Sequence, residues 1–388
     1  MNDESLKQSI NQTDVFDFHT HINAAHLVET DFWKIVEYFW FLREIRAAGY
    51  PQNASEMSED GRMAAYFAAY TKTPGTAMRM ALDFICRDLY GIEIKSVGDL
   101  HSLKEAIECT AELKGKDMLD RAKIKKVTIN EYAGLGGGES SNLTNFVHRI
   151  EPRPLAEGII KNKVYDPAME TIDQFFKDTV ANRGTGVVVP VDRMSKRVAD
   201  VKGMGDVQTL EDATIYAIRL ICAKAEEHNL AVQILTGMDF GWLGNGDRCM
   251  RNDPERIHKL HALFEDYRCN FDILCACDIN IPDIIQAVLL FPNVYAGGLW
   301  WMSFRPSIYR DLFEKRLEAI PSVKSGILAS DAYCAQWAYG KTMLVKRLLG
   351  DFLCDKVEKG YLDENGALQV AQDWLYHAGS CCYGTAQR

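Results

Sequence analysis

The sequence contains no run of about 18 consecutive apolar residues, the length that a membrane-spanning helix needs. Its first 14 residues, MNDESLKQSINQTD, are polar and lack the apolar core of a secretion signal. Basic residues are not in excess either, because 44 lysines and arginines stand against 54 acidic residues, a formal net charge of −10. These absences predict a cytoplasmic protein whose partners include neither a membrane nor nucleic acid.

The chain has 11 cysteines, an odd number, and several lie inside apolar runs, such as Cys275 and Cys277 in ILCACD. This distribution is typical of small buried side chains in a reducing compartment rather than of a disulfide framework. With 388 residues, 47% of them hydrophobic, the chain can bury a large core. We find no short repeat and no low-complexity tract that would divide it.

Short aliphatic runs alternate with longer amphipathic segments along most of the chain. Such runs suit strands that are buried on both faces of a parallel sheet. Eight of them alternating with helices predict an α/β fold, the (β/α)8 or TIM barrel. An open, doubly wound sheet is the alternative, but no GxGxxG follows the first run. The eight runs cover residues 14–20, 123–130, 145–150, 186–191, 230–237, 271–277, 293–301 and 325–331.

About 100 residues separate the first run from the second, and their pattern is helical throughout. We therefore expect two parts, a barrel formed by residues 1–21 and 124–388 and a helical insertion formed by residues 22–123. The insertion would follow the first barrel strand. Loops that follow barrel strands lie at the carboxyl-terminal face, so the insertion is expected to cap the active site.

The first run, VFDFHTHI, ends with two histidines, His19 and His21. Alternate residues of a strand share a face, so both imidazoles would point the same way while Thr20 points away. At the end of a barrel strand this pair would face the mouth, where it could bind Zn²⁺, Mn²⁺ or Fe²⁺. A purely structural role for the pair is the alternative.

Asp331 ends the eighth run, in ILASDAY. Strands 1 and 8 are neighbours in a closed barrel, which would bring Asp331 beside His19 and His21. Two histidines and one carboxylate form a mononuclear site with open positions for water and substrate. We therefore predict one divalent metal ion, with zinc first and manganese or iron as alternatives, and a catalytic role for Asp331. The competing interpretation is that Asp331 caps the following helix.

His-x-His ending strand 1 together with Asp ending strand 8 resembles the amidohydrolase superfamily. Residues 293–350, which include GGLWWMSF and SGILASDAY, are similar to one branch of it, the uronate (glucuronate) isomerases. FVHRIEPRPL resembles the Arg-x-x-Pro segment of that branch. The resemblance implies that Arg149 binds the substrate carboxylate, with a salt bridge at the barrel rim as the alternative. It also implies that Trp300 and Trp301 line the sugar site, one of them packed in the core.

The sequence departs from that family in two places, and from many amidohydrolases in a third, the histidines of strands 5 and 6. Phe39-Trp40 occupies the position of a His-Tyr pair, and Tyr333 stands where the family has an arginine two residues after the strand-8 aspartate. Tyr333 would then line the substrate site in place of that arginine. Strands 5 and 6 carry no histidine, so a binuclear centre is not expected.

The resemblance implies an aldose–ketose isomerase acting on a sugar acid such as glucuronate. A metal-dependent hydrolase or lyase on the same barrel is the alternative, favoured by the missing His-Tyr pair. A non-enzymatic binding protein that retains the metal site is a third possibility. The expected partner is a small acidic molecule, and the sequence leaves a homo-oligomer open.

Overall fold

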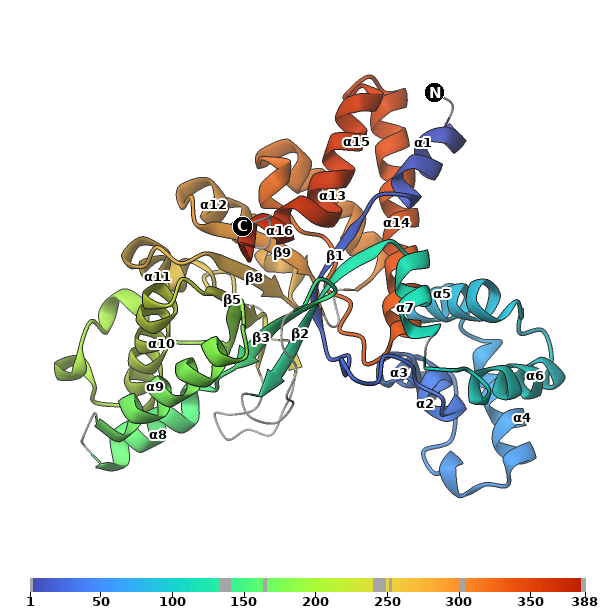
Figure 1. The fold of residues 1–388 in the computed structure, drawn as a ribbon, viewed down its shortest axis with the longest axis horizontal. Coiled ribbons are helices and arrows are strands. Elements are labelled where there is room, and N and C mark those ends of the chain that lie inside the picture. The colour runs from blue at the N-terminus through green and yellow to red at the C-terminus, as the bar shows by residue number, and fades with distance from the viewer. Residues whose placement is uncertain are drawn as a thin grey trace.

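The computed structural model describes residues 3–112, 114–132, 141–162, 166–239, 249–250, 253–300 and 304–384. Seven parallel strands form one sheet in the order β1-β2-β3-β4-β5-β8-β9, and together with their helices they make a TIM-like barrel (Figure 1). All seven correspond to predicted strands. They are β1 (Val15–Thr20), β2 (Ile124–Tyr132), β3 (Thr144–Arg149), β4 (Gly186–Pro190), β5 (Ala231–Thr236), β8 (Phe271–Cys275) and β9 (Val294–Leu299).

The predicted eighth strand, residues 325–331, lies between β9 and β1 but forms isolated bridges instead of a continuous ladder. Ser325 and Leu328 bridge to β9. On the other side, the Phe18 amide donates to the Leu328 carbonyl at 2.9 Å. The guanidinium of Arg316 also donates to the carbonyls of Ala296 and Gly326, and the Gly326 amide donates to the Ala296 carbonyl at 2.8 Å. The segment therefore closes the ring with fewer bonds than a regular strand.

Helices follow the strands as the alternating pattern predicted. The chain segment TLED shows why one of them begins where it does: the Asp212 amide donates to Thr209 Oγ1, and the Thr209 amide donates to the Asp212 carboxylate, a capping box that opens α10. The barrel helices and the amino- and carboxyl-terminal helices are α1 (Asp3–Asn11), α8 (Pro152–Asn162), α9 (Asp166–Ala181), α10 (Leu210–Glu227), α11 (His261–Asp266), α12 (Ile281–Leu290), α13 (Pro306–Ala319), α14 (Ala335–Glu358), α15 (Glu364–Gln372) and α16 (Ala378–Cys382). A short antiparallel pair, β6 (Met238–Asp239) and β7 (Cys249–Met250), follows β5.

Residues 22–123 contain a group of helices that gathers beside one end of α14 (Figure 1). The Trp337 indole of α14 donates to the Ile35 carbonyl at 3.0 Å, and its ring stacks on Tyr38 with centroids 4.1 Å apart. The group therefore shares a core with the barrel helix. Its members are α2 (Phe32–Val36), α3 (Phe39–Ala47), α4 (Glu59–Tyr70), α5 (Ala77–Phe84), α6 (Val97–Glu108) and α7 (Lys114–Arg121).

The carboxyl-terminal segment fills the end of the barrel at which the strands begin. The Tyr383 ring stacks on Phe16 with centroids 5.8 Å apart. A Cβ atom built on Gly186, the first residue of β4, would lie 3.3 Å from this tyrosine ring. Gly379 of α16 packs more closely still, since a Cβ there would lie 2.4 Å from the Phe16 ring. Tyr383 thus places its phenolic hydroxyl inside the barrel, entering from the end at which the strands begin.

The described part of the chain has no helix that is both long and apolar enough to cross a membrane. Its cysteines are free, and most of them are buried.

Candidate metal centre

His19, His21 and Asp331 meet where β1 ends, and their ligand atoms all lie within 4.8 Å of one another. His21 Nε2 lies 3.3 Å from Asp331 Oδ1, and His19 Nε2 lies 3.7 Å from the same oxygen. His19 is fully buried, whereas the His21 side chain keeps 28% of its exposure. The two imidazoles do share a face, with Thr20 turned away to donate to the Thr128 carbonyl.

Asp331 is held in a strained backbone conformation. Its φ of +54° lies in the left-handed region, which costs a residue other than glycine roughly 1–3 kcal/mol. Two hydrogen bonds maintain this conformation. The Asp331 amide donates to the His19 carbonyl at 2.8 Å, and the Asp331 carbonyl accepts the Tyr38 hydroxyl at 2.8 Å. Strain of this kind, fixed by the surroundings, is a feature of functional sites.

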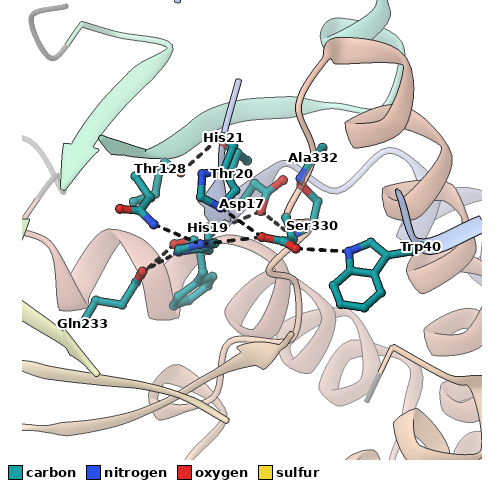
Figure 2. A network of polar contacts seen from close by, with 12 residues as sticks. Asp17, His19, Thr20, His21, Trp40, Thr128, Gln233, Ser330 and Ala332 are labelled. Carbon is teal, nitrogen blue, oxygen red and sulfur yellow. Dashed lines mark hydrogen bonds and ion pairs between the residues drawn. The ribbon is translucent and has the colours of Figure 1, made fainter. Parts of the chain in front are cut away.

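The competing interpretation of Asp331 as a helix cap is wrong. Helix α14 begins only at Ala335, and Cys334 occupies the cap position without a side-chain cap bond. Instead, the Asp331 carboxylate receives the indole N–H of Trp40, with Nε1 3.2 Å from Oδ2 (Figure 2). Oδ1 of Asp331 therefore faces the two histidines, while Oδ2 is held by the indole of Trp40.

The charges of the three groups suit a divalent cation. Burial, together with the neighbouring His21, lowers the pKa of His19 to about 3, so the ring is neutral at neutral pH. Burial opposes ionisation of Asp331, but the hydrogen bond from His21 and the nearby positive charges outweigh it and hold the pKa below its usual range. A neutral imidazole beside an ionised carboxylate is the donor set that Zn²⁺, Mn²⁺ and Fe²⁺ accept. The residues therefore fit the predicted ion.

Gln233 of β5 fixes the orientation of His19. His19 Nδ1 lies 2.6 Å from the amide oxygen Oε1 of Gln233, which can only accept, so Nδ1 carries the proton and Nε2 presents its lone pair toward Asp331 (Figure 2). The amide nitrogen of Gln233 donates to the Phe18 carbonyl at 2.8 Å, and it also lies 2.5 Å from the Tyr383 hydroxyl. A ligating histidine ordinarily needs such a partner behind it.

A chain of buried polar contacts continues from Gln233 to the bottom of the barrel. Its amide nitrogen lies 3.0 Å from Asp272 Oδ2, which also accepts the Tyr383 hydroxyl at 2.5 Å. Gln233, Asp272 and Tyr383 were not among the residues predicted from the sequence. A signal for the first two was present, since each is a polar residue inside an otherwise apolar strand run, AVQILT and FDILC.

Burial raises the pKa of Asp272 to about 6, although Tyr383 and Gln233 both donate to it. Between about pH 4 and 6 the folded protein then keeps a proton that the unfolded chain has lost, so this group's contribution to stability falls as pH rises. We expect the free energy of unfolding of the wild type, minus that of Asp272→Asn, to decrease over this window. Urea denaturation from pH 4 to pH 7 measures it, with exposed Asp311→Asn as the control. A flat difference would contradict the shifted pKa.

The predicted substrate residues lie in different settings. The Trp300 ring packs against His19 with centroids 5.9 Å apart and is nearly buried. Tyr333 stacks on His21 at 5.2 Å and is 54% exposed. Arg149 pairs with Glu151 through a 2.5 Å contact, which is the rim salt bridge named as the alternative. Trp301 lies outside the described residues.

The replacement of a His-Tyr pair by Phe39-Trp40 does not remove every polar contact from that position. The Trp40 indole supplies a hydrogen-bond donor to Asp331, a role that the sequence analysis did not foresee. An indole N–H donates only, however, and cannot exchange a proton with a substrate. Phe39 is 45% exposed and lies 4.4 Å below the Arg43 guanidinium.

Several solved structures have the same fold as this chain along nearly its whole length. A uronate isomerase from Thermotoga maritima matches with a TM-score of 0.81 and 13% identity, over 98% of this chain and 97% of that one. The chain has the uronate isomerase fold. Glucuronate isomerase from Caulobacter crescentus matches over 100% and 94% of the two chains, with a TM-score of 0.75 and 14% identity. A presumed metal-dependent hydrolase from Lactobacillus casei ATCC 334 matches over 98% and 97%, with a TM-score of 0.60 and 12% identity.

No family model and no curated protein sequence matches the chain. At identities of 12–15% the structural likeness establishes the uronate isomerase fold and leaves the reaction to be argued from the site.

Proposed function

We propose that this protein is a metal-dependent isomerase that converts an aldose form of a sugar acid, such as glucuronate, into the ketose. The observation that carries the proposal is the His19, His21 and Asp331 cluster at the end of β1, on a chain with the uronate isomerase fold along nearly its whole length. The likeness to uronate isomerases and to a presumed metal-dependent hydrolase supports an enzyme with a bound metal.

In this proposal His19, His21 and Asp331 hold one divalent ion, with zinc first and manganese or iron as alternatives. The bound metal would polarise the substrate's carbonyl and adjacent hydroxyl oxygens, as Lewis-acid metals do. Asp331 would accept the proton of the substrate hydroxyl and deliver it to the former carbonyl oxygen, while the C–H proton of the hydroxyl-bearing carbon moves to the neighbouring carbonyl carbon. Trp300 would offer an aromatic surface beside His19 to the sugar, and Tyr333 would flank the ring of His21.

Turnover of D-glucuronate and D-galacturonate tests the proposal. With added Zn²⁺ or Mn²⁺ we expect a ketose product, detected by a ketose-specific colour reaction, and none after the protein has been stripped with a chelator. Readdition of the metal should restore the product. Failure to form a ketose from either uronate, with metal bound, would contradict the isomerase.

A metal-dependent hydrolase is the second candidate, and one observation favours it. Trp40 occupies the place of a proton-exchanging pair and can only donate its N–H to Asp331. An enzyme that activates a metal-bound water needs one base, and Asp331 alone could supply it. Hydrolysis of sugar-acid lactones, without ketose formation, would support this candidate over the isomerase.

A further inference from the structure

Asn130 of β2 lies beside the proposed metal ligands. Its amide nitrogen Nδ2 is 3.5 Å from Nε2 of His19, the nitrogen that faces Asp331. The residue pairs with Val147 of β3, whose side chain packs inside the barrel with that of Trp300, so the Asn130 side chain also points inward. Asn130 is only 7% exposed. Polar side chains buried to this extent ordinarily have all their polar atoms paired.

The amide of Asn130 is only half satisfied. Among the residues that the structure describes, its oxygen Oδ1 is buried and has no hydrogen-bond partner. Its nitrogen Nδ2 faces the lone pair of His19 Nε2, because Nδ1 of that ring carries the proton and donates to Gln233. A buried polar atom without a partner destabilises the folded protein. The chain therefore keeps an unpaired amide oxygen directly beside the ligand cluster.

Binding of a divalent ion at His19 changes the preference of this amide. The lone pair of Nε2 is then used by the ion, and an N–H group that faces a cation is repelled by it. Rotation about the last side-chain bond of Asn130 exchanges the two ends of the amide, which are nearly equal in size. Oδ1 then takes the place of Nδ2, 3.5 Å from Nε2. One end of the amide stays unpaired in either orientation, so the attraction between Oδ1 and the ion decides between them.

The spacing of the donor atoms suits a single ion. His21 Nε2 and His19 Nε2 lie 3.3 and 3.7 Å from Asp331 Oδ1. The Asn130 amide lies at a similar distance, 3.5 Å, from His19 Nε2. Ligands at about 2.0–2.2 Å from a tetrahedral zinc ion lie about 3.3–3.6 Å from one another, so all these separations resemble those within one coordination shell. An amide oxygen is also a hard, neutral donor of the kind that Mn²⁺ accepts.

We infer that Asn130 is a fourth protein ligand of the divalent ion, through its oxygen Oδ1. The inference rests on the metal centre of the proposed function and is independent of the reaction that this centre catalyses. It adds β2 to β1 and the segment after β9 as the elements that hold the ion. On an octahedral ion such as Mn²⁺, four protein ligands leave two positions. A carbonyl oxygen and the adjacent hydroxyl of one sugar need that number.

Manganese binding tests the inference without any substrate. Wild type, Asn130→Leu, Asn130→Asp and the control Asn145→Leu are stripped with a chelator and titrated with Mn²⁺. The water molecules on the bound ion are then counted by water-proton relaxation. Asn145 is a matched control because it is a fully buried asparagine on the neighbouring strand β3, where its side chain bonds to Thr128 and Thr185 instead of a metal ligand.

We expect Asn130→Leu to bind Mn²⁺ about 100-fold more weakly, at the upper end of what the loss of a partner behind a metal ligand costs. The ion should also carry one more water than in the wild type, because water fills the position of the lost oxygen. Asn130→Asp supplies an oxygen at the same place, so it should bind at least as tightly and keep the water count. Asn145→Leu should match the wild type in both measurements, although it loses two hydrogen bonds and stability.

The outcomes separate the fourth ligand from the proposed function. Unchanged affinity and water count in Asn130→Leu, with the metal lost in His19→Ala, would overturn the fourth ligand and leave the metal centre in place. A raised KM for uronate at unchanged Mn²⁺ affinity would also overturn it and make Asn130 a substrate contact. Weaker binding and an added water, without any ketose from the wild type, would support the ligand and overturn the isomerase. The wild type alone gives a second measurement, since three waters on its six-coordinate Mn²⁺, instead of two, would overturn the fourth ligand.

Discussion

The His19→Ala variant should lose its divalent metal and at least about a thousandfold of its turnover. The ring is one of the three proposed ligands, and its fully buried Nε2 lies 3.7 Å from the Asp331 oxygen of the same cluster. A Lewis-acid metal contributes several kcal/mol to a reaction of this kind, and about 4 kcal/mol corresponds to a factor of about 1,000. Metal content measured by mass spectrometry, together with uronate turnover, checks the expectation.

His26→Ala is the matched control for this variant. His26 lies five residues beyond His21 but is exposed, and it is not a member of the ligand cluster. It should keep both metal and activity. If His19→Ala instead retained stoichiometric metal and wild-type turnover while folded, the metal centre could not be the one formed by His19, His21 and Asp331.

The fold could be predicted from the sequence because its signals are local. Buried parallel strands consist of short aliphatic runs, and seven of the eight runs became strands of one sheet. The position of Asp331 followed from one long-range rule, that the first and last strands of a closed barrel are neighbours. That rule does not depend on the details of the ladder, so it held even though residues 325–331 form only bridges to β9.

The contacts that orient the residues of the site could not be predicted from the sequence in the same way. Nothing in the sequence connects Gln233 to His19, 214 residues earlier, or Tyr383 to Asp272, 111 residues earlier. These contacts depend on which polar side chains meet inside the barrel once its strands are in register. Trp40 reaches Asp331 from the insertion, where sequence patterns specify helices but not how they pack. The sequence did not show that Arg149 forms a salt bridge with Glu151, and the binding of a substrate carboxylate by Arg149 stays a prediction.

The Gln233→Leu variant should bind the divalent metal about 10–100-fold more weakly, with a corresponding loss of activity at limiting metal. Leucine preserves the size of the side chain but removes the oxygen that accepts the Nδ1–H of His19 at 2.6 Å. Without this acceptor the ring can turn, or move its proton to Nε2, and both changes cost ligand strength. Metal titration with a competing chelator measures the affinity.

Tyr383→Phe is the variant that separates a specific effect on His19 from a general loss of stability. It removes the hydroxyl that donates to Asp272 and lies 2.5 Å from the amide nitrogen of Gln233, but it leaves the bond between Gln233 and His19 in place. Both variants disturb a fully buried network and should lower the free energy of unfolding, whereas only Gln233→Leu should weaken metal binding by tenfold or more. Equal metal affinities in the two folded variants would mean that Gln233 packs beneath His19 without orienting it. If the two variants had similar free energies of unfolding but Gln233→Leu bound the metal more weakly, the amide oxygen of Gln233 would be the group that keeps Nε2 of His19 free to bind the metal.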